Sequence, residues 1–314
     1  MSCMNTNRNA PTGRLTARMA LNLAAPHTWP AAIMPTLIAA SAAAVAGAVS
    51  VSMTLVLLVI VVLMQSSVNT FNDYYDFVKG SDSAEDNVDP SDAVLVYNDV
   101  NPRSALLLAI GFLVAAFLLG IYAIMKAGFA PLIIALVGAL FVVLYSAGKS
   151  PISYLPLGEL VSGVVMGGLI PLAVFQVLTG TLDFLMLVKS IPTIIGVGLI
   201  MFTNNTCDIE RDIPSGRRTL PVLLGRQNAV AWYRIALIVW IAVIILNVSI
   251  WYTPGLIIAP FMILAAYPLA KALFSNSFTP NRRLQAMPQI LSVNITLGAF
   301  YAAAILASSI SLTL

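Results

Sequence analysis

Charged side chains are scarce in this sequence. Only 9% of its 314 residues are Asp, Glu, Lys or Arg, whereas 59% are hydrophobic and the mean hydropathy is +0.92. A soluble globular domain carries about 25% charged residues. The composition therefore excludes an ordinary soluble domain and predicts a protein that resides in a lipid bilayer.

Cysteine and histidine are nearly absent as well. The cysteines are Cys3 and Cys207, and the one histidine is His27. Two cysteines so far apart exclude a disulfide framework, and with a single histidine they also exclude a zinc site. The sequence has no P-loop, Rossmann or haem motif and no nucleic-acid-binding signature, so we expect no nucleic-acid partner.

Long apolar runs take up most of the chain instead. A hydrocarbon core about 30 Å thick needs roughly 20 apolar residues in a helix, and nine runs approach that length. The sequence therefore predicts an all-α membrane protein with nine transmembrane helices around a central cavity. The runs lie at 29–49, 51–70, 104–125, 128–146, 157–179, 184–205, 229–251, 254–274 and 289–312.

The first apolar run has a second interpretation, because its small residues at 41–48 resemble a signal-peptide cleavage site. The run is long for a signal peptide, and residues 14–30 before it are typical of an interfacial helix. We therefore interpret the run as a membrane span.

Lys and Arg residues predict the orientation in the membrane. A cytoplasmic N-terminus places fourteen of the sixteen on the cytoplasmic side and leaves Lys126 and Lys189 on the other side. We expect one domain over 1–314 in the plasma membrane, with its N-terminus and its active site in the cytoplasm. Residues 1–28 form its cytoplasmic N-terminal segment in this prediction, and 77–103 and 206–227 form two cytoplasmic, Asp-rich loops.

Carboxylates gather at two of the predicted cytoplasmic ends. Eight of the 13 acidic residues lie within 73–99, and three more follow the sixth apolar run. Asn72 and Asp76 are four residues apart, as are Asp208 and Asp212, so each pair shares one face of a helix. Because the second and sixth runs end in the same pattern, we expect two related halves that face each other across the cavity.

Carboxylates that face each other repel unless cations lie between them. Oxygen ligands without His or Cys favour Mg²⁺ or Mn²⁺ over zinc, and Mg²⁺ completes its shell with water and phosphate oxygens. Nearby basic residues are then partners for a diphosphate. The predicted metal ligands are Asn72, Asp73, Asp76, Asn204, Asp208 and Asp212, and the predicted diphosphate ligands are Lys149, Arg211, Arg217 and Arg218.

Two other interpretations of the carboxylates stay open. Asp86, Asp89 and Asp92 are better explained as part of a solvated acidic loop. An ion-coupled transporter would also have acidic residues in two related halves, but there the acids lie in broken helices at mid-membrane. In this sequence they lie at helix ends beside long polar loops, which favours a magnesium–diphosphate site.

Three segments resemble the signatures of the UbiA superfamily of membrane prenyltransferases. They are NDYYD at 72–76, YSAGK at 145–149 and DIERD at 208–212. The segments NDYYDFVKGSD, YLPLGE and GRRTLPVLLGR look most like the 1,4-dihydroxy-2-naphthoate polyprenyltransferases of menaquinone synthesis. The resemblance implies a helical bundle with a cavity open to lipid, Mg²⁺ as cofactor, and a polyprenyl diphosphate and an aromatic acceptor as substrates. 4-Hydroxybenzoate is the alternative acceptor.

The resemblance also bears on individual residues. Members that act on 4-hydroxybenzoate carry an Asp where this chain has Gly80, and Asp82 is a candidate replacement as metal ligand. Relatives often carry Lys or Arg in place of His27. Two interpretations of His27 are therefore open: it contacts the acceptor or the diphosphate, or it lies at the membrane interface without a role. Tyr145 and Lys149 are the predicted catalytic residues. The ring of Tyr145 would stabilise an allylic cation; the alternative is that Tyr145 is a structural tyrosine at a helix end.

Overall fold

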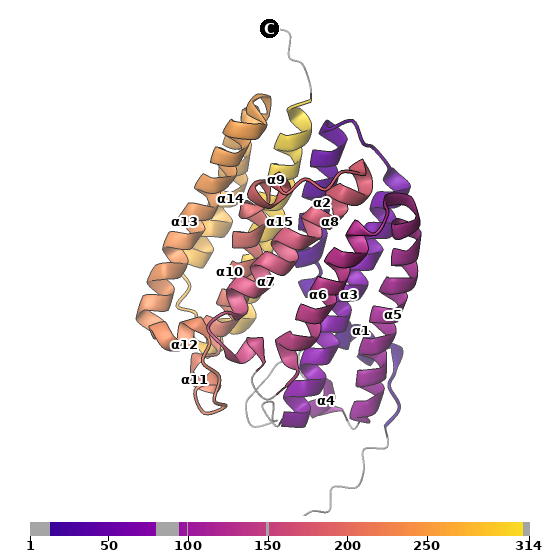
Figure 1. The fold of residues 1–314 in the computed structure, drawn as a ribbon. Coiled ribbons are helices and arrows are strands. Elements are labelled where there is room, and N and C mark those ends of the chain that lie inside the picture. Colours follow the sequence, from indigo (N-terminus) through magenta and orange to yellow (C-terminus); the bar gives the residue numbers. More distant parts are fainter. Residues whose placement is uncertain (1–12, 80–93, 99, 149–150, 310–314) are drawn as a thin grey trace, which may run out of the picture.

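The chain folds into an elongated bundle of helices (Figure 1). The computed structural model describes residues 13–79, 94–98, 100–148 and 151–309. Within these ranges the structure is helical apart from its connections, and one isolated β-bridge joins Gly13 to Val100. The predicted all-α class is confirmed.

Among its described residues, the first half of the chain contributes six α-helices, of which four are apolar and at least 16 residues long, and one 3₁₀ turn. Thr16 caps the first helix by accepting a hydrogen bond from the backbone N–H of Met19. The helices are α1 (Ala17–Ala24), the 3₁₀ turn η1 (Pro26–Thr28), α2 (Pro30–Val45), α3 (Val51–Lys79), α4 (Val94–Tyr97), α5 (Pro102–Ala127) and α6 (Ala130–Ser146).

The second half of the chain includes one helix that is interrupted by a π-helical turn, and its described residues divide into more elements, many of them short, than those of the first half. Its elements are the 3₁₀ turn η3 (Ile152–Tyr154), α7 (Gly158–Val164), the π-helical turn η4 (Val165–Leu169), α8 (Ile170–Thr179), α9 (Leu185–Lys189), α10 (Ile191–Cys207), α11 (Ile209–Asp212), α12 (Leu220–Leu224), α13 (Arg226–Trp251), the 3₁₀ turn η5 (Thr253–Ile258), α14 (Ala259–Phe274), the 3₁₀ turn η6 (Pro280–Arg282) and α15 (Arg283–Ala307).

The predicted count of nine spans is not confirmed, although each of the nine apolar runs contains a helix. Among the described residues, six helices are long and apolar enough to cross a membrane, and a seventh is added if the bent pair Ala17–Thr28 and Pro30–Val45 is one span. Helices α6 and α10 have 17 residues each. At 1.5 Å per residue they rise about 25 Å, less than the hydrocarbon thickness.

The two predicted Asp-rich loops contain more helix than the sequence indicated. Helix α3 continues to Lys79, and α4 lies inside the predicted loop 77–103. The predicted loop 206–227 contains α11 and α12, and α13 begins within it. Polar residues at the end of an apolar run therefore continue the helix here. Figure 1 shows α4, α11 and α12 together at one end of the bundle.

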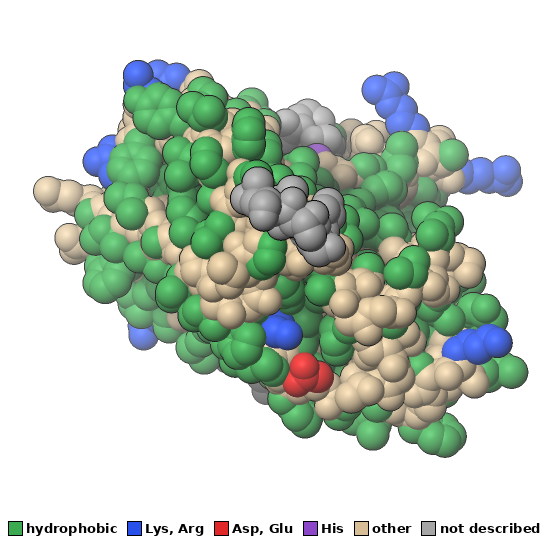
Figure 2. All heavy atoms as spheres, turned by 90° about the horizontal axis from the view of Figure 1, so that it is seen from above, with side chains coloured by type: hydrophobic (Ala, Val, Ile, Leu, Met, Phe, Trp, Pro, Cys, Tyr) green, Lys and Arg blue, Asp and Glu red, His purple; other side chains and the backbone are tan. Residues whose placement is uncertain are grey.

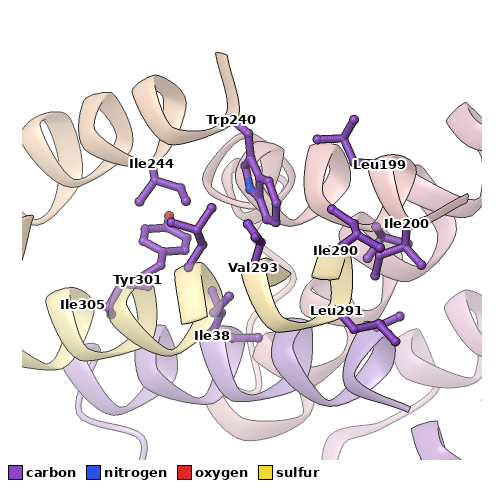
Figure 3. Packing of buried hydrophobic residues seen from close by; sticks show 14 of the residues in the cluster. Ile38, Leu199, Ile200, Trp240, Ile244, Ile290, Leu291, Val293, Tyr301 and Ile305 are labelled. Atoms are coloured by element: carbon purple, nitrogen blue, oxygen red, sulfur yellow. The ribbon is translucent and has the colours of Figure 1, made fainter. Parts of the chain in front are cut away.

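The core lies where α2, α10, α13 and α15 meet (Figure 3). Trp240 and Ile244 of α13 pack there against Ile290 and Tyr301 of α15, with Ile38 of α2 beside them. All five side chains are buried. This packing holds α10 in the middle of the bundle, with its polar end directed towards the end that carries α11 and α12.

Two glycines allow α7 and η4 to approach α10 closely. A Cβ atom on Gly163 would lie 2.6 Å from the backbone oxygen of Ile194, and one on Gly167 would lie 2.5 Å from that of Thr193. Both distances are too short for a side chain, so only glycine fits. Small residues thus permit the close packing of these helices.

The outer surface is apolar around the bundle. Large hydrophobic side chains are exposed on α5, α6, α13 and α14, among them Leu107, Phe117, Leu140, Ile238 and Leu264. Figure 2 shows that hydrophobic and uncharged side chains also dominate one end of the molecule. Exposed apolar surface on this scale is the surface of a multi-pass membrane protein, since a water-soluble monomer rarely has it.

Candidate active site

A cavity of about 730 Å³ lies between α2, α3, α6, α7, α10 and α15. Its lining is polar towards the end of the bundle that carries α11, where α3 and α10 supply Asn and Asp side chains. It is apolar along α10 and α15, which supply Val197, Ile200, Met287, Leu291 and Ile295. The cavity can therefore hold a ligand with one charged end and one hydrocarbon end.

The first motif lies on α3 and presents its polar residues to the cavity. The Asn72 Nδ2 group donates a hydrogen bond of 3.0 Å to Asp76 Oδ2, so the predicted shared helical face is confirmed. Ser146 Oγ at the end of α6 donates to Asn72 Oδ1 over 3.1 Å. Asp76 is only 6% exposed, and its other oxygen, Oδ1, lies 2.7 Å from Arg217 Nη2.

Asp73 lines the same cavity but also has a structural contact. Its Oδ2 atom accepts a hydrogen bond of 3.0 Å from the backbone N–H of Val94, the first residue of α4. A carboxylate at this position satisfies one of the backbone donors that a helix N-terminus leaves unpaired. Asp73 therefore attaches α4 to α3.

The second motif lies at the end of α10 and on α11. Asn204 and Asp208 line the cavity. Asp212 lies one helical turn further along and is 2% exposed; Thr219 Oγ1 donates to its Oδ2 atom over 3.4 Å. Burial raises the pKa of Asp212 to about 6, although the positive charge of Arg217 opposes the shift.

Arg217 joins the two motifs. Its guanidinium lies 2.7 Å from Asp76 Oδ1 and 3.8 Å from Asp212 Oδ1, and it stacks on the ring of Tyr154 at 4.9 Å. Burial alone would lower the pKa of Arg217, but Asp76 and Asp212 outweigh burial and raise it. The expectation that the two Asp-rich motifs face each other across one cavity is confirmed by this contact.

The described carboxylates among the predicted metal ligands do not gather into one cluster. Within the part of the chain that the structure describes, no three His, Cys, Asp or Glu side chains are close enough to hold one metal ion. Guanidinium groups neutralise the carboxylates instead: Arg217 bridges Asp76 and Asp212, and Arg283 Nε lies 3.4 Å from Asp208 Oδ1. The donors are nonetheless all oxygen atoms, and a magnesium ion typically takes only one or two carboxylates from the protein. The residues therefore fit magnesium with one carboxylate from each motif.

The other predicted site residues divide into three groups. Arg211, Tyr145 and His27 line the cavity; burial, with Arg217 and Arg283 nearby, lowers the pKa of Arg211. Arg218 is exposed outside the cavity lining, and its backbone N–H donates to the carbonyl oxygen of Tyr154. Of the two adjacent arginines, Arg217 is thus the one that reaches the site. Two predicted residues, Lys149 and Asp82, lie outside the described residues.

Sequence reasoning missed Arg283 as a site residue. It is the first residue of α15 and lines the cavity, and its Nη2 group donates to Asn204 Oδ1 over 2.9 Å. In the sequence it was counted only among the basic residues that set the orientation. Its position a few residues before the last apolar run was the available signal.

Sequence reasoning also missed a contact between two residues, Glu159 on α7 and Asn205 on α10. Asn205 lines the cavity, and its Nδ2 group donates to Glu159 Oε1 over 2.8 Å. Glu159 is 6% exposed, and its Oε2 atom has no hydrogen-bond partner among the described residues. The sequence shows Glu159 only as an acidic residue at the start of a span.

Comparison with known proteins decides the family. The model of the UbiA prenyltransferase family matches residues 32–309. This chain belongs to the UbiA prenyltransferase family. Among curated relatives of this UbiA-family chain, the 1,4-dihydroxy-2-naphthoate octaprenyltransferase of Bacillus subtilis (strain 168) is 34% identical over 223 residues, which cover 71% of each chain.

Solved structures show the same fold. A UbiA homolog from Archaeoglobus fulgidus superposes with a TM-score of 0.64 at 15% identity and covers 92% of this chain and 98% of its own. The same archaeal homolog bound to GPP and Mg²⁺ superposes with a TM-score of 0.60 at 14% identity, over 90% and 99% of the two chains. The arrangement of the helices described above is therefore that of the UbiA fold.

Proposed function

We propose that this UbiA-family transferase moves a polyprenyl group from a polyprenyl diphosphate to 1,4-dihydroxy-2-naphthoate. The products are CO₂, pyrophosphate and the quinol form of demethylmenaquinone, which becomes demethylmenaquinone only by a separate two-electron oxidation, and the cofactor is Mg²⁺. One observation carries the proposal: two Asn/Asp motifs and three arginines converge at the polar end of a cavity whose remaining lining is hydrocarbon. The acceptor follows from the name of the Bacillus subtilis relative and the cofactor from the magnesium-bound archaeal homolog.

The polar end of the cavity supplies charge for the leaving group. Magnesium held by oxygens of Asn72, Asp76, Asn204, Asp208 and Asp212, with Asp73 and Asp82 as further candidates, would supply positive charge that stabilises the departing diphosphate. Arg211, Arg217 and Arg283 line the same end, and we assign the phosphate oxygens to them and to Lys149. Arg217 and Arg283 also contact carboxylates of the two motifs in the structure described here.

The rest of the cavity holds the carbon chain and protects the reacting carbon. The side chains of α10 and α15 exclude water from the prenyl group, which would otherwise capture the cation. Tyr145 lines the cavity on α6, and its ring is the electron-rich face that we assign to the allylic cation. In the transfer the C1–O bond of the prenyl diphosphate breaks and a bond from C1 to the ring carbon forms.

The naphthoate ring then regains aromaticity by losing CO₂, whose bonding electron pair returns to the ring. This route needs no strong base beside the acceptor. Attack on 4-hydroxybenzoate would instead require removal of a ring proton. Among the described carboxylates outside the two motifs, Glu159 is bonded to Asn205 and Asp183 lies near α9, away from the cavity lining. The scarcity of bases favours the decarboxylating acceptor.

The orientation completes the proposal. We place the N-terminus and the polar end of the cavity on the cytoplasmic side of the plasma membrane. Fourteen of the sixteen Lys and Arg residues support that assignment. The diphosphate of one substrate and the carboxylate of the other would then reach the site from the cytoplasm.

The test uses purified protein, magnesium, one long prenyl diphosphate and a panel of aromatic acceptors, including 1,4-dihydroxy-2-naphthoate labelled in its carboxyl carbon. We expect one labelled CO₂ and one pyrophosphate for each prenyl group transferred. A product that keeps the label, or clear preference for 4-hydroxybenzoate, would overturn the assigned acceptor. Absence of pyrophosphate with every acceptor would overturn the transferase proposal itself.

A further inference from the structure

Glu159 and Asn205 form a buried pair that the proposed transfer does not use. Glu159 lies in the first turn of α7 and Asn205 on α10, and each is only 6% exposed. The 2.8 Å hydrogen bond between them joins two helices that pack closely at Gly163 and Gly167. An ionisable group in such a place is costly to bury, so a functional role is the first interpretation to consider.

The pairing determines which atom of Asn205 a ligand can contact. An ionised carboxylate only accepts hydrogen bonds, so it binds the NH₂ end of the carboxamide and excludes the flipped amide. With Nδ2 bound to Glu159, Oδ1 is the remaining polar atom of the Asn205 side chain. Oδ1 has no hydrogen bond within the described ranges, and Asn205 lines the cavity. The site therefore contains a fixed hydrogen-bond acceptor.

The surroundings of Asn205 indicate which substrate this acceptor recognises. A carbonyl oxygen repels phosphate oxygens, and the arginines mark the diphosphate end. Asn205 is bonded instead to Glu159 of α7, whose carbonyl oxygen accepts from the Ser162 hydroxyl, and Ser162 and Tyr145 of α6 also line the cavity. The Tyr145 hydroxyl lies 3.5 Å from the position that a Cβ atom on Gly158 would take, directly before Glu159. Asn205 therefore lies near the ring that we assign to the allylic cation, where the acceptor must bind.

We propose that Asn205 Oδ1 accepts a hydrogen bond from a ring hydroxyl of the aromatic acceptor, and that Glu159 is the positioning residue that fixes the amide for this contact. This inference rests on the proposed prenyl transfer to a dihydroxy aromatic acid. A hydroxyl that donates to oxygen increases the electron density of its ring, which favours attack by the ring on the allylic carbon. No proton is transferred to the amide, so the pair acts by orientation and selection.

The test combines protein variants with acceptor analogues in a binding measurement that needs no turnover. Fluorescence titration gives the dissociation constants of 1,4-dihydroxy-2-naphthoate and of two analogues, each lacking one of the two hydroxyls, for wild type, Asn205→Ala and Glu159→Gln. Loss of one buried hydrogen bond should weaken binding of the dihydroxy acid about tenfold in Asn205→Ala. The analogue without the bonded hydroxyl should bind wild type and both variants with the same, weaker affinity.

Glu159→Gln separates positioning from packing. The new side chain has nearly the same size as the glutamate but could bond either end of the amide, so we expect weaker binding of the acceptor with unchanged binding of the prenyl diphosphate. Equal losses for the dihydroxy acid and both analogues would overturn the inference, because the pair would then only support the fold. A loss confined to magnesium or prenyl diphosphate binding would overturn it too, since Asn205 would then serve the charged end.

Two controls keep these outcomes separate. Gln176→Leu removes another buried amide, one on α8 that donates to the carbonyl oxygen of Ala127 outside the cavity lining, and should leave acceptor binding unchanged. If Asn205→Ala does not fold, the double variant Glu159→Leu with Asn205→Leu removes both polar partners at similar size and should recover folding but not acceptor binding. Wild type that prenylates no dihydroxy acid would refute the proposed function before any variant is made.

Discussion

The ion pairs of Arg217 predict a stability that depends on magnesium. Arg217 contacts Asp76 at 2.7 Å and Asp212 at 3.8 Å, and the three side chains are 14%, 8% and 3% exposed. Removing one partner of such a buried pair leaves uncompensated charge and typically costs about 3–5 kcal/mol. We therefore expect Arg217→Gln to lower the free energy of unfolding by about that amount when magnesium is absent.

Magnesium should reverse much of this loss if the carboxylates are its ligands. A ligand at a hundred times its dissociation constant stabilises the folded state by about 2.7 kcal/mol. In the variant both carboxylates are accessible to the ion without displacing a guanidinium, so the variant should gain more from magnesium than wild type does.

The assay is thermal unfolding of purified wild type and Arg217→Gln in a chelator and in saturating magnesium. Arg282→Gln is the matched control, because Arg282 is exposed and donates to Gln285 nearby; its stability should match that of wild type both in the chelator and in magnesium. Equal destabilisation of Arg217→Gln in both conditions would show that the carboxylates do not bind the ion. An unchanged stability in the chelator would show that the ion pairs contribute little.

Three further predictions concern activity and metal binding. Asp76→Ala and Asp208→Ala should each lower turnover by orders of magnitude in protein that still folds, whereas Asp183→Ala, outside the cavity lining, should not; near-normal turnover of Asp76→Ala at saturating magnesium would refute the metal assignment. Magnesium affinity, measured by titration at several pH values, should fall as the pH drops below about 6. The reason is that burial raises the pKa of Asp212 to about 6, and the protonated carboxyl cannot bind the ion. A magnesium affinity that stays constant from pH 7 to 5 would contradict this. Arg283→Gln should weaken binding of pyrophosphate more than binding of the acceptor, and unchanged pyrophosphate affinity in direct binding would assign Arg283 to the fold alone.

The sequence by itself predicted the helical membrane fold and the geometry inside the first motif. Hydrophobic run length and the 3.6-residue period are local properties, so the shared face of Asn72 and Asp76 on α3 could be inferred without a structure. Run length did not decide the span count, because where α6 and α10 begin and end depends on neighbouring turns and helices. The continuation of helix beyond the Asp-rich motifs had no local signal that separated it from a polar loop.

Contacts between distant segments were decided only by the tertiary structure. The repeat of the motif indicated that two Asp-rich ends face each other, but not that Arg217 lies between them or that Arg283 binds Asn204 across 79 residues. Glu159 and Asn205, 46 residues apart, likewise meet because α7 packs closely on α10 at two glycines. The physical reason is that helix packing sets which side chains of different helices meet, and one sequence records the period of each helix but not its rotation against its neighbours.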